Sequence, residues 1–340
     1  MYTGRQYPIG MTLLWTWGFI ALPAVMAGAV FAMYHWLGWH FLALPASALA
    51  ILGTAVSFYL GFKGNAAYGR LWEARKIWGG IVNSSRTWGV FTKDYITTHF
   101  AANAEEQHEL EAVHRELVYR HIAWLGAFRT LLRRPRTWET QVNTAQHFRK
   151  VWGTLDMSDA RLRSRIEKFI DAEELEWVMA RKNAATQLLS KQSEQLRELH
   201  AIGLLDDFRH MEMGRMIETF YTLQGKAERI KNFPLPRQYA SANSWFVQIF
   251  VFALPFALVP AFADIGGNIA ALLALPCSTT LAWIFLTWNK IVDWSENPFD
   301  GLGNDIPIDA LSRTIEIDLR EMLGEDDLPP KIEAKNLILM

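Results

Sequence analysis

Formal charge is absent from a long stretch near the start of the chain, residues 6–62, which contains no Asp, Glu, Lys or Arg. Two more uncharged blocks follow much later, at residues 238–263 and 265–289, and only Asp264 separates them. A helix that crosses a bilayer needs about 20 mostly apolar residues. The first block is long enough to cross twice, so the pattern predicts four transmembrane helices at about 11–36, 43–62, 242–262 and 267–289.

The basic residues beside these spans predict the orientation of the chain. Most of them, among them Lys63, Arg70, Arg237 and Lys290, flank one side of the predicted membrane region. The other side has only a short loop near residues 36–40 and the loop at Asp264. Because cytoplasmic loops carry the excess of Lys and Arg, we expect both termini to be cytoplasmic.

The 175 residues between the two membrane halves, 63–237, are charged and have helical periodicity. In residues 106–133, apolar side chains recur at three- and four-residue steps, which is typical of an amphipathic helix. Residues 62–88 contain no Pro, which favours one helix that continues from the membrane into the cytosol. We expect further helices at 138–152, 160–170, 172–200, 206–230 and 310–323, the last with Asp309 as its N-cap.

No alternating strand pattern competes with these helices. The sequence therefore predicts an all-α membrane protein with a single fold over residues 1–340. It would consist of the four membrane segments, a large cytosolic helical region at 63–237, and a C-terminal cytosolic segment at 290–340 that we expect to form a belt.

Catalytic and cofactor motifs are missing from the sequence. Cys277 is the only cysteine, and His108, His114 and His121 follow six- and seven-residue steps instead of the four-residue step of HExxH. GxSxG, Walker A and GxGxxG motifs do not occur, and the polar residues of the predicted spans are scattered. We expect no enzyme activity, no metal and no cofactor. We interpret the basic cluster at 129–136 as a solvated helix end, so we expect no nucleic-acid partner.

The second predicted span carries the most informative pattern. Thr54, Phe58 and Phe62 recur every four residues and therefore fall roughly along one helix face. Such Phe residues usually pack against lipid or another helix. The functional alternative is a hydrophobic pore constriction, where rings of side chains from several subunits gate by dewetting. Aromatic ring edges are electropositive, so edges turned toward the axis of a pore would favour anions.

Three segments of the chain carry a family resemblance: SFYLGFKGNAAYGRLWEARKIWGGIVNSSRTW at 57–88, QGKAERIKNFPLPRQYA at 224–240 and ENPFDGLGNDIPIDALSRTIEIDLREML at 296–323. They resemble segments of the bestrophin family, in its bacterial branch. They lie in the family's order and, together with the hydropathy pattern, cover most of the chain. The region 90–200 matches only in its helical character.

This resemblance implies a homo-pentameric funnel in the bilayer around one central pore, with a cytosolic helical vestibule. In the family, three positions four residues apart on the second membrane helix line the neck of the pore. On this chain those positions are Thr54, Phe58 and Phe62. The resemblance also implies a second constriction, the cytosolic aperture, for which Leu205 or Phe208 is the expected residue.

Two departures from the family pattern limit what the resemblance implies. Animal members bind calcium through a dense acidic run after an Asn-Pro-Phe element, whereas residues 300–305 lack that density. We therefore interpret Asp300, Asp305 and Asp309 as turn and helix-cap residues. Bacterial members with aliphatic necks resemble cation channels, and members with aromatic necks pass anions, so Phe58 and Phe62 favour anions.

The sequence thus predicts a passive chloride or similar anion channel of a bacterial inner membrane. A cation (sodium) channel of the same architecture and a membrane-anchored scaffold remain the alternatives. For subunit packing we name four residues just below the second span, where charges are spaced to face a partner helix as well as water: Trp72, Glu73, Arg75 and Arg86.

Overall fold

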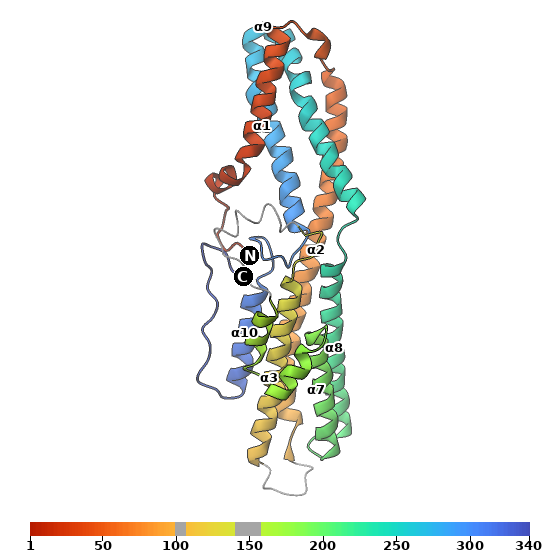
Figure 1. The fold of residues 1–340 in the computed structure, drawn as a ribbon, viewed down its shortest axis with the longest axis vertical. Coiled ribbons are helices and arrows are strands. Elements are labelled where there is room, and N and C mark those ends of the chain that lie inside the picture. Colours follow the sequence, from red (N-terminus) through yellow and green to blue (C-terminus); the bar gives the residue numbers. More distant parts are fainter. Residues whose placement is uncertain (99–106, 140–157) are drawn as a thin grey trace. The chain divides into compact units, whose positions relative to one another are not determined.

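The computed structural model describes residues 1–98, 107–139 and 158–340, and the regular elements in these ranges are helices (Figure 1). The predicted all-α fold is confirmed. The chain forms two compact units. Unit 1 contains Met1–Thr3, Leu71–Phe233 and Pro298–Met340, and unit 2 contains Gly4–Arg70 and Pro234–Asn297.

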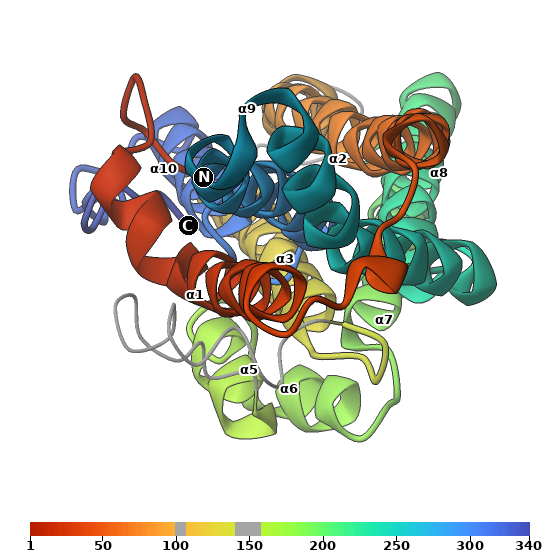
Figure 2. The same cartoon turned by 90° about the horizontal axis from the view of Figure 1, so that it is seen from above.

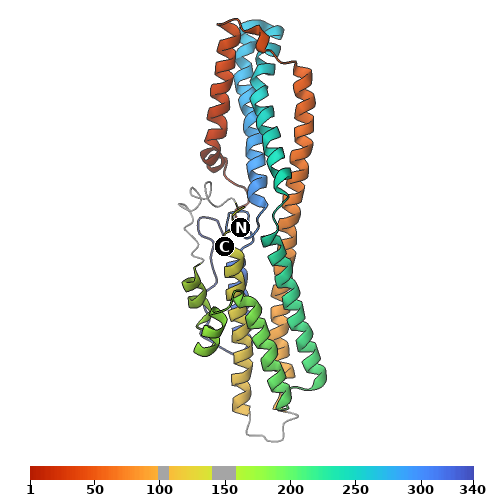
Figure 3. The ribbon, with the colours of Figure 1, turned by 45° about the vertical axis from the view of Figure 1, so that its right-hand side comes forward.

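Unit 2 contains the apolar helices. They are α1 (Ile9–His35), the short 3₁₀ turn η1 (His40–Leu42), the first part of α2 (Ala46–Tyr95), and α9 (Arg237–Ser295). Three described helical stretches are long and apolar enough to cross a bilayer: Ile9–His35, His40–Tyr95 and Arg237–Ser295. Within this unit α1 packs along α9, as Figures 1 and 3 show.

Helix α9 is two helical segments joined by a break. Gly266 and Gly267 leave the helical region, and Gly267 has a φ of +66°, which glycine adopts without steric cost. The two segments then run antiparallel, because Asn243 Nδ2 donates to Asn289 Oδ1 at 3.3 Å and the rings of Phe250 and Phe285 lie 4.7 Å apart. The break lies where the sequence predicts a loop between the third and fourth spans.

Helix α2 is unbroken for 50 residues. This confirms the continuous helix predicted across 62–88, which contains no Pro. The helix begins among residues of unit 2 and ends among residues of unit 1.

Unit 1 is a bundle of the second part of α2 with six more described helices. In chain order they are α3 (Gln107–Arg133), α5 (Asp159–Ile166), α6 (Ala172–Met179), α7 (Ala184–Ala201), α8 (Asp207–Asn232) and α10 (Ile308–Met322). Helix α3 is central, since α5, α7, α8 and α10 all contact it. Figure 3 shows α3, α7 and α8 side by side, and Figure 2 shows α5 and α6 next to each other.

The core of unit 1 is aromatic. Trp124 stacks on Phe128 with ring centroids 5.6 Å apart, and Trp78 stacks on the same ring at 5.8 Å. His121 packs among these rings and shares a 2.9 Å hydrogen bond with Ser85 Oγ. Burial lowers the pKa of His121 to about 3, so this histidine is a neutral core residue.

Three sequence predictions about the helices of unit 1 are wrong in detail. The helix expected at 172–200 is interrupted, because α6 ends at Met179 and Asn183 caps α7 by accepting a hydrogen bond from Thr186 N at 3.1 Å. The helix expected to reach 170 ends at Ile166. Pro307 and not Asp309 occupies the N-cap position of α10, and Asp309 lies in the first turn. Most of the helix expected at 138–152 lies outside the described residues.

The C-terminal segment pairs with the N-terminus. Leu339 N donates to Met1 O at 2.8 Å, and Tyr2 forms an isolated antiparallel bridge with Ile338. The backbone N–H of Ala310 in α10 donates to Met340 O at 2.7 Å. The two ends of the chain therefore form one part of unit 1.

Candidate functional site

The predicted neck residues lie on an exposed face of α2. Phe58 and Phe62 are 65% and 63% exposed within the subunit, and Thr54 is exposed on the same face. The opposite face carries Val56 and Leu60, which are buried. An exposed aromatic stripe on an apolar helix needs another surface, which can be lipid, a second subunit or a pore.

Packing against α9 fixes which face of α2 is exposed. Val56 and Leu60 belong to a buried cluster with Val247 and Leu254 of α9. The helices approach closely at Gly53, where a Cβ atom would lie only 2.8 Å from the Phe250 ring. The rotation of α2 about its axis is thereby set, and the neck residues point away from α9.

Lys63 adds a polar constraint at the end of this stripe. Its side chain is fully buried, and its Nζ lies 2.5 Å from Asp293 Oδ1 and 3.2 Å from Asn289 Oδ1. A buried ammonium needs such partners, because an unpaired charge in this environment is costly. The sequence alone identifies Lys63 only as a basic residue beside the second predicted span. The signal that could have revealed the pair is Asp293, an acid at the matching end of the fourth span.

The hydroxyl of Thr54 is partly used within its own helix. Thr54 Oγ1 donates to Ala50 O at 2.9 Å, and Ser57 Oγ donates to Gly53 O at 2.8 Å. Back-bonding of this kind is common for Ser and Thr in apolar helices. Thr54 therefore offers hydroxyl lone pairs but no free donor to anything that passes this face.

The two aperture candidates differ in exposure. Leu205 is only 2% exposed and belongs to the core of unit 1, so its burial does not favour the aperture role predicted for it. Phe208 is 82% exposed in the first turn of α8. Asp206 holds that turn by accepting hydrogen bonds from Phe208 N and Arg209 N at 3.0 and 3.2 Å.

The residues predicted for subunit packing already have contacts within the subunit. Glu73 pairs with Lys76 on the same helix at 2.6 Å, and the Arg75 guanidinium lies 5.9 Å from the Trp72 ring. Arg86 pairs with Asp318 of α10 at 2.8 Å, so its charge is used inside unit 1. Trp72 is half-exposed and is the large apolar group of this set.

The segment after Asn297-Pro298-Phe299 forms a buried ionic network. Asp305 accepts hydrogen bonds from Gly301 N and Leu302 N at 2.6 and 2.9 Å, which confirms it as a turn residue. Asp300 lies 3.6 Å from Lys231 Nζ, which also pairs with Glu139. Burial, followed by repulsion from Asp305, raises the pKa of Asp300 to about 8. Lysine and arginine side chains supply the positive charge beside these carboxyls.

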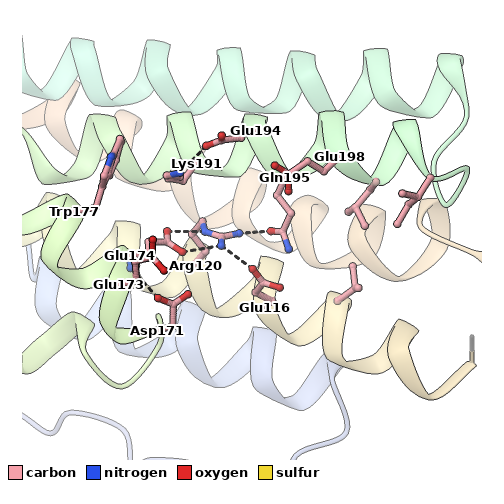
Figure 4. Close-up of a pocket in the computed structure, with 13 residues that line it drawn as sticks. Glu116, Arg120, Asp171, Glu173, Glu174, Trp177, Lys191, Glu194, Gln195 and Glu198 are labelled. Carbon is pink, nitrogen blue, oxygen red and sulfur yellow. Dashed lines mark hydrogen bonds and ion pairs between the residues drawn. The ribbon is translucent and has the colours of Figure 1, made fainter.

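Acids are the most common charged residues in the lining of a separate cavity in unit 1. It has a volume of about 440 Å³, and Figure 4 shows Arg120 between Glu116, Glu174 and Gln195. Both Glu174 oxygens accept from Arg120 at 2.7 Å, and Glu116 accepts at 2.8 Å. The buried cation is thus fully paired. Among the described residues, no group of three or more His, Cys, Asp or Glu is placed to hold a metal ion.

Comparison with known proteins shows the family of the chain. The family profile described as "Bacterial/Fungal Bestrophin protein" matches residues 10–321. The voltage-dependent anion channel-forming protein YneE of Salmonella typhi is 28% identical over 315 residues, which cover 92% of this chain and 88% of YneE. A Ralstonia nicotianae protein with the same description, RSc3414, is 29% identical over 300 residues, which cover 87% of this chain and 83% of that protein.

Solved structures show the same fold. A crystal structure of a bacterial bestrophin homologue from Klebsiella pneumoniae superposes with a TM-score of 0.71 at 22% sequence identity. The match covers 92% of this chain and 98% of that one. Because the family profile spans most of the chain and the helical fold agrees, the chain belongs to the bacterial/fungal bestrophin family.

Proposed function

We propose that this protein is a subunit of a pentameric anion channel in a bacterial inner membrane. The observation that carries the proposal is the exposed stripe of Thr54, Phe58 and Phe62, held outward by the packing of α2 on α9. The names of the relatives, which are voltage-dependent anion channel-forming proteins, support the class of ion. Chloride is the expected permeant anion.

The chemistry of the stripe suits a selective neck. Five copies of Phe58 and Phe62 around an axis would form two apolar rings, which are hard for a hydrated ion to enter and can gate by dewetting. Ring edges turned toward the axis would present the positive part of the aromatic quadrupole to an anion. The Thr54 ring would offer hydroxyl oxygens and ease hydration at one level.

The remaining features complete the proposal. Phe208, exposed at the start of α8, is the proposed cytosolic aperture, and unit 1 is the proposed wall of the vestibule. Both termini would be cytoplasmic, because the basic flanks of the spans favour that orientation. The paired carboxyls after Phe299 favour a structural role for this segment and no calcium switch, since Lys231 and Arg133 already lie beside them.

A cation channel of the same architecture is the main alternative. It would use the same helix face, and the two aromatic rings are the feature that favours anions over cations. A membrane scaffold would explain the helical unit 1 but gives no reason for the outward aromatic stripe. Family membership and the channel-forming relatives argue against a membrane enzyme.

Single-channel recording in planar bilayers under a chloride gradient tests the neck. Phe58→Ala should raise the conductance and weaken the preference for anions, because it removes an apolar ring and its positive edges together. Thr54→Ala should change the conductance less, and Phe208→Ala should raise it if that ring forms the aperture. Phe252→Ala, at an exposed position of α9, is the matched control. A Phe58→Ala channel with the parent's conductance and reversal potential would contradict the assignment of the neck to α2.

A further inference from the structure

Unit 1 contains a second charged cavity, which the channel proposal does not use. Its volume is about 590 Å³, within the usual size range of small-molecule sites. Helix α3, the region of α5, helix α10 and the segment after α10 line it, with Tyr119, Ser164, Phe169, Pro329 and Ile332 among its walls.

The charge of this cavity is strongly positive. Six cationic side chains line it, and only two carboxylates do, those of Asp309 and Glu316. The cations are Arg129, Arg161, Arg165, Lys168, Arg313 and Arg320. A concave site with such an excess of one sign concentrates counter-ions of the opposite sign.

At the floor of the cavity, the carboxylate of Asp309 lies near several guanidinium groups. Asp309 lies 3.6 Å from Arg129, 3.5 Å from Arg165 and 3.6 Å from Arg133. These distances are long for charge-assisted hydrogen bonds, which are about 2.7–2.9 Å. The Nε atom of Arg129 is buried and has no hydrogen-bond partner in the described part of the chain. The floor therefore has donors that Asp309 does not satisfy.

The rim of the cavity has free cations as well. The side-chain nitrogens of Arg161 and Lys168 have no ion-pair or hydrogen-bond partner among the described residues, and both residues are exposed. On the α10 side, Arg313 pairs with Glu316 at 3.1 Å, and Arg320 pairs with Glu325 at 2.5 Å. The uncompensated charge thus lies toward α3 and α5.

The electrostatics of Arg165 agree with this geometry. Burial, and then the positive charge of Arg129, lower the pKa of Arg165 to about 10. Asp309 acts in the opposite direction but does not restore the ordinary value. A bound anion would relieve the repulsion among these guanidinium groups.

We propose that this cavity binds a multivalent phosphate-bearing anion, held by Arg129, Arg165, Arg161 and Lys168. Arginine forks match the planar pairs of oxygens on phosphate groups, and a mixed set of Arg and Lys is typical of phosphate sites. The phosphate can belong to a soluble metabolite or to a lipid headgroup. The proposal depends on unit 1 alone and stands whether or not the chain conducts anions.

Isothermal titration calorimetry of the full-length protein in detergent, with sodium pyrophosphate at constant ionic strength, tests this proposal. The parent should bind pyrophosphate saturably, and Arg161→Gln/Lys168→Gln should bind about tenfold more weakly, since each exposed pair is worth up to about fivefold. Glu316→Gln should bind more tightly, because it removes a carboxylate from the cavity. A merely structural defect would not strengthen binding.

Helix α7, away from this cavity, provides the matched control. Lys191→Gln/Arg197→Gln removes the same two charges from that other part of unit 1 and should leave pyrophosphate binding unchanged. A parallel arm measures binding to phosphatidylglycerol and phosphatidylcholine vesicles. If the Arg161→Gln/Lys168→Gln variant loses binding to phosphatidylglycerol vesicles but not to pyrophosphate, the bound phosphate belongs to a lipid headgroup. The proposal is overturned if the parent binds neither probe, or if both double variants weaken binding equally.

Discussion

Asp300 couples the stability of unit 1 to pH at the scale of a single residue. Its pKa is raised to about 8 by burial and by the neighbouring carboxyls, against an ordinary value near 4. The folded protein therefore keeps a proton that the unfolded chain has released. Stability from this group is fully present below about pH 4 and is lost as the pH rises toward 8.

Replacement of Asp300 by Asn should flatten that dependence. Asn keeps the shape of a protonated Asp and cannot ionise, so the variant should lose less thermal stability than the parent between pH 6 and pH 8. The measurement is the thermal unfolding midpoint in detergent at both pH values. Asp326→Asn, at an exposed position, is the control and should follow the parent. If the thermal unfolding midpoints of the parent and of Asp300→Asn change equally between pH 6 and pH 8, Asp300 is already ionised at pH 6.

Residue roles were harder to predict than helix positions, because ionic partners are distant in sequence. Asp309 has a normal sequence context for a helix cap, yet it lies beside Arg129, Arg133 and Arg165 from two other helices. Lys63 has the context of a membrane flank, yet it is buried beside Asp293. The shared helix face of Thr54, Phe58 and Phe62 was predictable because it depends only on local helix geometry.

At the scale of elements, the pair Lys63–Asp293 ties α2 to α9 within unit 2. Asp293→Ala leaves a fully buried ammonium without its carboxylate and should destabilise the protein by roughly 3 kcal/mol. The double variant Lys63→Met/Asp293→Ala removes both charges and should recover most of that loss. Thermal unfolding of the two variants in the same detergent measures the difference. A double variant no more stable than Asp293→Ala would mean that the ion pair does not hold the helices together.

The sequence predicted most helices of this fold but not every boundary. The apolar periodicity continues across residues 180–183, so the sequence predicted one helix there. In the structure one helix ends before these residues, and Asn183 caps the next. The break in α9 was visible because Asp264 and two glycines interrupt an apolar block. Pairing of the C-terminal segment with the N-terminus was not predictable, since neither end has a strand pattern and their contacts are non-local.

Assembly is the main question at the scale of the whole molecule, because one subunit cannot enclose the proposed pore. Trp72 is the large, half-exposed aromatic residue of the predicted packing set, and aromatic residues dominate the energetics of interfaces. Trp72→Ala should therefore weaken each subunit interface by about 2 kcal/mol. Native mass spectrometry at low protein concentration should then show a smaller fraction of pentamer than in the parent.

Arg86→Ala is the control for assembly. Its charge pairs with Asp318 inside the subunit, so the loss of association free energy should stay below about 1 kcal/mol and the pentamer should persist. If Trp72→Ala forms as much pentamer as the parent, this part of α2 does not lie in the subunit interface. A parent protein that is monomeric in every detergent would contradict the pore itself.

The reversal potential of the purified parent protein tests the central claim most directly. In a planar bilayer with a tenfold gradient of sodium chloride, an ideal monovalent selectivity gives a potential of about 59 mV, with opposite signs for anions and cations. The proposed aromatic neck of Phe58 and Phe62 predicts a potential close to the chloride value, with a clear shift toward zero in Phe58→Ala. A potential close to the sodium value would contradict the anion channel.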